Sequence, residues 1–88
     1  MKTSLYHPAV ELALKYIDEE NYEKAFELLL IAAKDGEAEA QYNLGLMYDQ
    51  GKDYTKALRY YKLAADQGDV VAEAAFDELR MMYSKSND

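Results

Sequence analysis

The sequence predicts an all-α protein, a right-handed α-solenoid of two antiparallel helix pairs followed by a C-terminal capping helix. The first reason is an internal repeat, in which ten residues recur with an offset of 32 positions. A fixed period of this length is typical of solenoid proteins, whose units each bury an apolar face against the next unit. The second reason is helical spacing of apolar residues, with no alternating pattern of the kind that strands show. Four of the recurring pairs are Leu12 and Leu44, Tyr16 and Tyr48, Ala25 and Ala57, and Gly36 and Gly68.

Local signals place the helices in order along one domain. We expect helices over residues 8–17, 22–34, 37–50, 54–67 and 70–83, with a frayed polar tail over 84–88. Pro8 suits a first helical turn, where its missing N–H costs nothing. Gly36 and Gly68 stop the second and fourth helices, because glycine adopts the left-handed C-cap without a Cβ penalty. The first repeat then covers about 8–36, the second about 38–68, and the capping helix about 70–83.

The apolar residues also predict how the helices pack. Alanines seven residues apart form a narrow seam on the second and fourth helices: Ala25, Ala32, Ala57 and Ala64. Residues with i, i+4 spacing are expected to face inward: Leu12, Tyr16, Leu44 and Tyr48. Five tyrosines are assigned to packing positions: Tyr16, Tyr22, Tyr48, Tyr54 and Tyr61. Gly45, with Ala13 at the equivalent position, is small enough to let the two helix pairs approach closely.

The last helix has the composition of a cap. By the repeat offset, Glu73, Asp77 and Arg80 occupy positions that would pack on a following helix. They instead form one polar stripe, as expected where a repeat array must remain soluble at its end. The opposite face is expected to dock on the second repeat through Val71, Ala72, Ala75, Phe76, Leu79 and Tyr83.

The second repeat resembles Sel1-like and tetratricopeptide repeats. The resemblance is carried by Leu44-Gly45-x-x-Tyr48, by the pair Lys56-Ala57 and by Ala64-Ala65-x-x-Gly68, the last of which is similar to Sel1 in particular. Gly51 runs almost directly into Asp53, a spacing nearer to that of a tetratricopeptide unit. The first repeat is degenerate, with Ala13 in place of Gly45 and Glu19 in place of Gly51.

This resemblance implies a protein- or peptide-binding adaptor whose first helices line a concave apolar groove with acidic rims. Carried over to this chain, the partner-binding residues would be Val10, Glu11, Leu14, Ile17, Asp18, Glu39, Tyr42, Asn43, Leu46, Asp49, Gln50, Ala74 and Glu78. Affinity would come from Leu14, Tyr42 and Leu46. Asn43 is expected to bridge to the backbone of an extended peptide, because an amide both donates and accepts.

Composition narrows the choice of partner. The formal net charge is −7 and the pI is about 4.6, which disfavours nucleic acid and anionic membrane surfaces as ligands. A segment carrying basic and aliphatic residues is the favoured partner. Residues 1–8 contain no apolar segment typical of a signal peptide, and no stretch approaches the ~20 apolar residues of a membrane span. The sequence therefore predicts a cytoplasmic protein.

No catalytic, metal or cofactor site is predicted. There is no cysteine, and the single histidine, His7, has one carboxylate in helical register at Glu11, far short of a metal site. His7 is expected to be a surface residue. Two alternatives to an adaptor remain: a structural or homo-oligomerising protein that pairs two copies through the C-terminal helix at Met81-Met82-Tyr83, and, more remotely, an enzyme.

Overall fold

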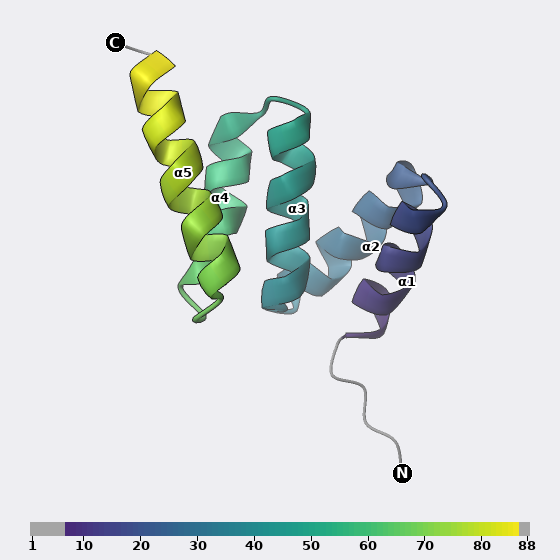
Figure 1. Ribbon diagram of the computed structural model, residues 1–88. Coiled ribbons are helices and arrows are strands. Elements are labelled where there is room, and N and C mark those ends of the chain that lie inside the picture. The colour runs from purple at the N-terminus through teal and green to yellow at the C-terminus, as the bar shows by residue number, and fades with distance from the viewer. Residues whose placement is uncertain (1–6, 87–88) are drawn as a thin grey trace.

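The computed structural model describes residues 7–86, and side chains over 7–84, and every regular element in that range is a helix. The five helices are α1 (Pro8–Asp18), α2 (Tyr22–Lys34), α3 (Ala38–Gln50), α4 (Tyr54–Ala65) and α5 (Val70–Ser86). Each packs against its neighbours in the chain, so the helices form a row from α1 to α5 (Figure 1). The all-α prediction is confirmed, and the right-handed sense of the row stays a prediction.

Two predicted helix ends were wrong by more than one residue. α4 ends at Ala65 and not at 67, because the N–H groups of Gly68 and Asp69 turn back to the carbonyl oxygens of Ala65 and Ala64. α5 continues to Ser86 and not to 83, so the expected frayed tail is helical over 84–86. The rest of that tail, residues 87–88, lies outside the described residues.

Side-chain caps begin α1, α2, α4 and α5, whereas Glu37 at the start of α3 makes no such hydrogen bond. The carboxamide oxygen of Asn21 accepts from Lys24 N at 3.4 Å, and 32 residues later Asp53 Oδ1 accepts from Lys56 N at 3.3 Å. Asp69 Oδ1 accepts from the N–H groups at the start of α5, at 3.0 Å each. Such caps satisfy backbone donors that have no partner within the helix. These polar residues therefore fix where the four capped helices begin.

A residue with positive φ follows four of the helices, and it is glycine in two cases and a non-glycine residue in the other two. Gly36 and Gly68 have φ of 90° and 98°, as their C-cap role predicts. The turns between the helices of each pair use the same left-handed conformation at Glu20 and Lys52, with φ of 61° and 66°. Gly51, one residue earlier, has an ordinary φ of −84°. The left-handed residue is thus non-glycine in both turns, where it is strained.

The core follows the predicted alanine seam. Ala25, Ala32, Ala57 and Ala64 are all 0% exposed. Leu44 is also fully buried, in the cluster that α3 forms with α1 and α2. Leu12, at the equivalent position of α1, is 43% exposed, so its inward orientation was wrong. The reason is positional, because α3 has α2 on that side whereas α1 has no described helix there.

Gly45 acts within the second helix pair and not between the pairs, which corrects the sequence-based expectation. A Cβ on Gly45 would lie 2.4 Å from Cδ1 and 2.5 Å from Cε1 of Tyr61 on α4. In the first repeat the equivalent positions hold Ala13 and Leu29, both fully buried in one cluster. A smaller residue on one helix therefore accompanies a larger one on its partner.

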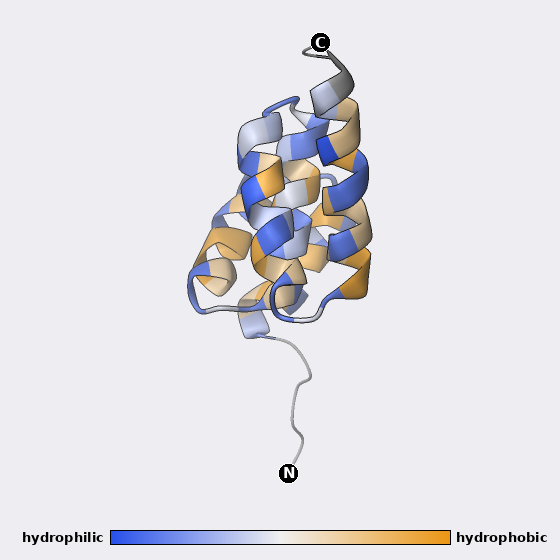
Figure 2. Ribbon diagram, turned by 90° about the vertical axis from the view of Figure 1, so that its left-hand side faces the viewer, coloured by the Kyte–Doolittle hydropathy of each residue, from blue (hydrophilic) through white to orange (hydrophobic). Residues whose placement is uncertain are grey.

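The polar stripe of α5 lies on its exposed side, as predicted. Glu73, Asp77 and Arg80 are all exposed, and Arg80 Nη2 lies 3.6 Å from Asp77 Oδ1. On the other side Leu79 packs with Ala57 and Tyr61 of α4. Hydrophobic and hydrophilic residues alternate in patches along the helices (Figure 2). The expected docking of Val71 was wrong, because this residue is 56% exposed at the first turn of α5.

Candidate partner-binding site

Two hollows lie along the helices α1, α3 and α5. The larger hollow has a volume of about 420 Å³ and lies between α3 and α5, with α4 behind them. It is lined by Tyr42, Leu46, Asp49, Tyr54, Tyr61, Ala75, Glu78, Leu79, Met82 and Tyr83. The smaller hollow, of about 170 Å³, is lined by Ile17, Tyr22, Asn43, Leu46, Met47 and Gln50. Leu46 of α3 borders both and therefore joins them.

Tyr61 forms the back wall of the larger hollow. Its side chain is 1% exposed, and Gly45 leaves room for its ring. The Tyr61 hydroxyl donates to Asp49 Oδ2 at 3.0 Å, which fixes this carboxylate at the hollow. Burial raises the pKa of Tyr61, and the hydrogen bond to Asp49 and the negative charges of Asp49 and Glu78 raise it further. The Tyr61 phenol is therefore protonated at neutral pH and donates to Asp49, and the negative charges of both Asp49 and Glu78 act on it.

Aromatic side chains dominate the rest of the larger hollow. The ring centroids of Tyr42 and Tyr61 lie 5.9 Å apart, and those of Tyr54 and Tyr83 lie 6.0 Å apart. Pairs at this separation lie within the attractive range for aromatic rings. Tyr42 and Tyr54 are half-buried and Tyr83 is 38% exposed, so each ring combines packing with accessible surface.

Asn43 is held by its own helix. Its Nδ2 donates to the backbone oxygen of Glu39 at 2.8 Å and lies 3.4 Å from Glu39 Oε2. The donor half of the amide is therefore engaged, which differs from the two-sided bridge expected from the sequence. Its Oδ1 makes no hydrogen bond among the described residues and remains available as an acceptor beside the smaller hollow.

The structure brings together seven of the thirteen residues expected to bind a partner. Those at the hollows are Tyr42, Leu46, Asp49 and Glu78 on the larger, and Ile17, Asn43, Leu46 and Gln50 on the smaller. Six lie outside both. Leu14 is half-buried against the first core cluster, Glu39 holds Asn43, and Glu11, Asp18 and Ala74 are exposed.

Val10 is the residue whose expected position disagrees most with the structure. It is 0% exposed and belongs to the core cluster of α1, α2 and α3. Its side chain cannot contact a partner in this conformation, so Val10 belongs to the core and lines neither hollow. The helical spacing that Val10 shares with Leu14 could not separate a core position from a groove position, because the two are adjacent on the same helix.

Sequence reasoning assigned Tyr22, Tyr54 and Tyr61 to packing alone. Tyr22 is 52% exposed and lines the smaller hollow, and Tyr54 lines the larger one. These two tyrosines are 32 residues apart and begin the second helix of each repeat. The repeat offset was therefore a signal for two equivalent hollows, although it could not show that the rings border open space.

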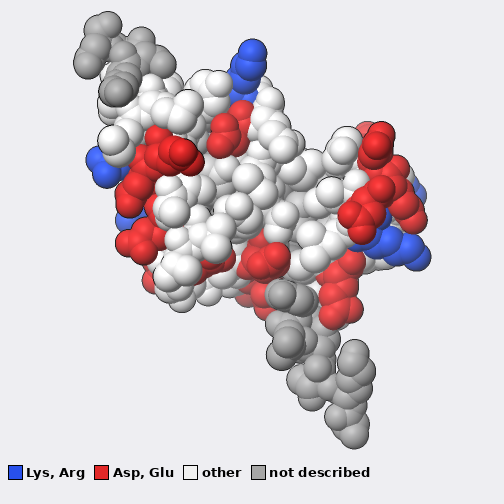
Figure 3. Space-filling view, viewed as in Figure 1, with Lys and Arg blue, Asp and Glu red and all other residues white. Residues whose placement is uncertain are grey.

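Charge is distributed unevenly around the hollows. None of the residues that line them is Lys, Arg or His, and the carboxylates of the larger hollow are Asp49 and Glu78. Figure 3 shows, on the side presented by α1, α3 and α5, an uncharged central surface with carboxylates around it. Asp49 and Glu78 form no ion pair with the described basic side chains.

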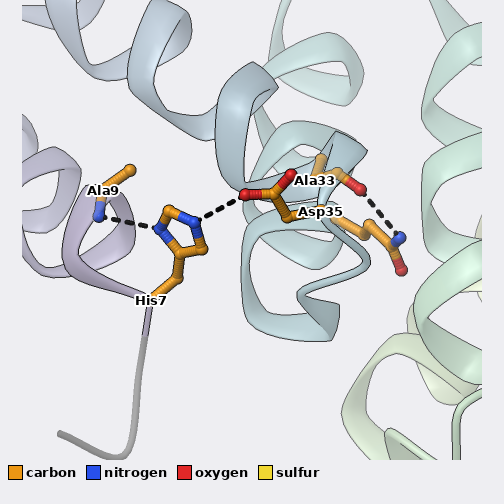
Figure 4. A network of polar contacts seen from close by, with 5 residues as sticks. His7, Ala9, Ala33 and Asp35 are labelled. Carbon is orange, nitrogen blue, oxygen red and sulfur yellow. Dashed lines mark hydrogen bonds and ion pairs between the residues drawn. The ribbon is translucent and has the colours of Figure 1, made fainter.

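His7 has a structural position. Its Nδ1 accepts from Ala9 N at 3.0 Å and so caps α1, and its Nε2 lies 2.8 Å from Asp35 Oδ2 at the end of α2 (Figure 4). It therefore contacts Asp35 and caps a helix, which sequence reasoning did not foresee. Nearby, Gln41 is 5% exposed and donates to the backbone oxygen of Ala33 at 3.3 Å. These contacts fix α1 and α3 relative to α2.

No group of three or more His, Cys, Asp or Glu side chains among the described residues is arranged to hold a metal ion. Within the same part of the chain, no helix combines the length and apolarity needed to cross a bilayer.

The row of helix pairs, the recurring caps and the hollows on one side define a helical repeat protein. Comparison with protein families agrees: the model for the Sel1 repeat matches residues 14–37 and 38–69, which together make up more than half of the chain. The chain belongs to the Sel1 repeat family. Sel1 repeats generally mediate protein–protein interactions and are typically non-enzymatic. No curated protein and no solved structure gave a match.

Proposed function

We propose that this protein is an adaptor that binds a segment of another protein along the two hollows of α1, α3 and α5. The observation that carries the proposal is that Leu46, a half-buried apolar residue, borders both hollows. A segment lying across it would contact three helices of the row. Aromatic residues beside such a centre are typical of interface hot spots.

The chemistry of the partner follows from the lining. The apolar and tyrosine side chains of the hollows would contact aliphatic residues of the partner, and the carboxylates around them would attract its Lys or Arg side chains. Gln50 and the oxygen of Asn43 offer polar contacts at the smaller hollow, where they would orient the segment. We place the protein in the cytoplasm as part of the same proposal.

The experiment is capture of partners from the native host lysate by wild type and by the Leu46→Glu variant, followed by calorimetry with the partner so identified. We expect Leu46→Glu to weaken binding at least about tenfold, as loss of a hot spot does. The matched control is Ile31→Glu, because Ile31 is 54% exposed on α2 and lines neither hollow.

The outcomes are separable. A partner lost by Leu46→Glu and kept by Ile31→Glu supports the proposal, provided that circular dichroism shows both variants folded. If Leu46→Glu is unfolded, Leu46→Ala replaces it in the same comparison. Equal affinity of the two folded variants would refute the site.

Self-association is the second candidate function, because α5 exposes apolar side chains near both of its ends. Val70 is 72% exposed, Val71 56%, and Met81 and Met82 59% each. Apolar patches of this kind mark interfaces in other proteins. Sedimentation equilibrium tests it: a dimer that Val71→Glu with Met81→Glu converts to monomer supports pairing through α5. A wild-type monomer at high concentration refutes it.

A further inference from the structure

The larger hollow combines tyrosine rings with two carboxylates that form no ion pair with any basic side chain that the structure describes. Asp49 and Glu78 come from α3 and α5, on opposite sides of α4. The described basic side chain of α5, Arg80, is engaged elsewhere, because it lies 3.6 Å from Asp77 and 5.8 Å from the ring centroid of Phe76. Among the described residues, the lining of the larger hollow therefore has two carboxylates and no cation to pair with them.

We propose that the larger hollow receives an arginine side chain of the bound segment, with its guanidinium at Asp49 and Glu78 and its methylene stem against Tyr42 and Leu79. The inference rests on the proposed function, since it names the residue that the partner places in this hollow. A guanidinium stacks on aromatic rings and pairs with carboxylates through several N–H groups at once.

Three features of the hollow favour arginine over other side chains. Its charges are negative, so a carboxylate or phosphate on the partner would be repelled. Four of its ten lining residues are tyrosines, which favours a cation that lies over rings. A guanidinium is also more weakly hydrated than an ammonium, so that entering an apolar hollow costs arginine less than lysine.

The geometry around Tyr61 prepares Asp49 for this role. The Tyr61 hydroxyl occupies Oδ2 of Asp49 at 3.0 Å, and it is held by a ring that is 1% exposed. The carboxylate is thereby fixed in one orientation before a partner binds, and its Oδ1 makes no hydrogen bond among the described residues. Glu78 is exposed at the edge of the hollow and can close on a cation that Asp49 already holds.

The test uses two peptides that differ in charge and not in shape. Acetyl-Ala-Leu-Arg-Leu-Ala-amide and the same peptide with citrulline in place of arginine are titrated into the ¹⁵N-labelled protein at fixed ionic strength. We expect the arginine peptide to shift the amide signals of Tyr42, Leu46 and Leu79 saturably, and to bind about fivefold more tightly than the citrulline peptide, as two partly exposed charge pairs allow.

Variants identify the carboxylates responsible. Asp49→Asn with Glu78→Gln removes both charges and keeps an oxygen that accepts from Tyr61, and we expect it to abolish the preference for arginine. Glu78→Gln alone, at an exposed side chain, serves if the double variant does not fold. The matched control is Glu23→Gln with Glu27→Gln, which removes two exposed carboxylates of α2 that line neither hollow. It should leave the preference unchanged.

Four results would overturn the inference. Equal binding of the arginine and citrulline peptides, or a preference that survives Asp49→Asn with Glu78→Gln, would show that this hollow does not select for the charge. A lysine peptide that binds as tightly as the arginine peptide would refute the choice of arginine. Binding of free n-butylguanidinium as tight as that of the peptide would assign the hollow to a small cation.

The proposed function fails separately. If Leu46→Glu abolishes capture of the native partner while the arginine and citrulline peptides bind equally, the adaptor role stands and the arginine subsite is wrong. If no native partner depends on Leu46 and neither peptide shifts Tyr42 or Leu79, both are wrong.

Discussion

Gly45→Ala tests the packing of α3 on α4, which also positions Tyr61 at the larger hollow. The added Cβ would lie 2.4 Å from Cδ1 and 2.5 Å from Cε1 of Tyr61, against a normal separation of about 3.5–4.0 Å between carbon atoms. The ring or the helix must therefore move by about 1 Å. The ring has little freedom to do so, because it is 1% exposed and its hydroxyl is bonded to Asp49.

The expected loss of stability is the difference between two effects. Overpacking a buried contact costs about 1–3 kcal/mol, and the upper part of that range, about 2–3 kcal/mol, applies because the ring has little freedom to move. Replacing glycine by alanine inside a helix gains about 1 kcal/mol. We expect Gly45→Ala to lower the free energy of unfolding by about 1–2 kcal/mol, and the melting temperature by roughly 5–15 °C for a domain of this size. Urea unfolding followed by circular dichroism measures the free energy.

The first repeat supplies the double variant that isolates the contact. Its equivalent pair is Ala13 and Leu29, so Gly45→Ala with Tyr61→Leu reproduces in the second repeat a combination that the chain already uses. Tyr61→Leu alone is destabilising because it leaves a cavity and removes a hydrogen bond. In that background we expect Gly45→Ala to be neutral or to stabilise by up to about 1 kcal/mol, since the ring that it meets is gone.

The matched control is Gly51→Ala. Gly51 has a φ of −84°, and the nearest atoms to an added Cβ are backbone oxygens at 3.5 and 3.6 Å, an ordinary contact. This variant should be as stable as wild type or slightly more so. The reasoning is refuted if Gly45→Ala is also as stable as wild type, or if it destabilises equally in the Tyr61→Leu background.

Three further predictions concern the caps and Tyr61. His7→Ala should lower the free energy of unfolding by about 0.5–2 kcal/mol, and His7→Asn should lower it less because asparagine still caps α1. Equal losses for the two variants in thermal melts would mean that the contact of His7 with Asp35, and not the cap, provides the stability. Lys52→Gly should stabilise by about 0.5 kcal/mol, because relief of a left-handed φ of 66° exceeds the entropic cost of glycine, and a loss measured in urea would contradict this. Above pH 10 the Tyr61 phenol loses its proton in the unfolded chain and keeps it in the native protein, where its pKa is raised. The free energy of unfolding should therefore fall by up to about 1.4 kcal/mol per pH unit. Tyr61→Phe should remove this slope in urea titrations at pH 9–11, and an unchanged slope would contradict the prediction.

The family resemblance predicted the repeat more accurately than it predicted which residues line the hollows. Leu44-Gly45-x-x-Tyr48 and Ala64-Ala65-x-x-Gly68 identified the repeat correctly, as the family match confirms. They predicted the groove only as a list along three helices, and the structure concentrates seven of its thirteen residues at two hollows. A list by helix face could not separate Val10, in the core, from Leu46, at the surface of both hollows.

The sequence by itself determined the order of helices, the alanine seam and the glycine C-caps, because these depend on residues a few positions apart and on an offset of 32 that repeats them. Only the tertiary structure decided what lies at each surface. Leu12 and Leu44 have equivalent positions, yet Leu12 is 43% exposed and Leu44 is fully buried, since α3 has α2 on that side and α1 has no described helix there. The size of the larger hollow depends in the same way on the distance between α3 and α5, which is set by how closely each of these helices packs on α4. That distance depends on the fit of Tyr61 against Gly45, and no local pattern encodes it.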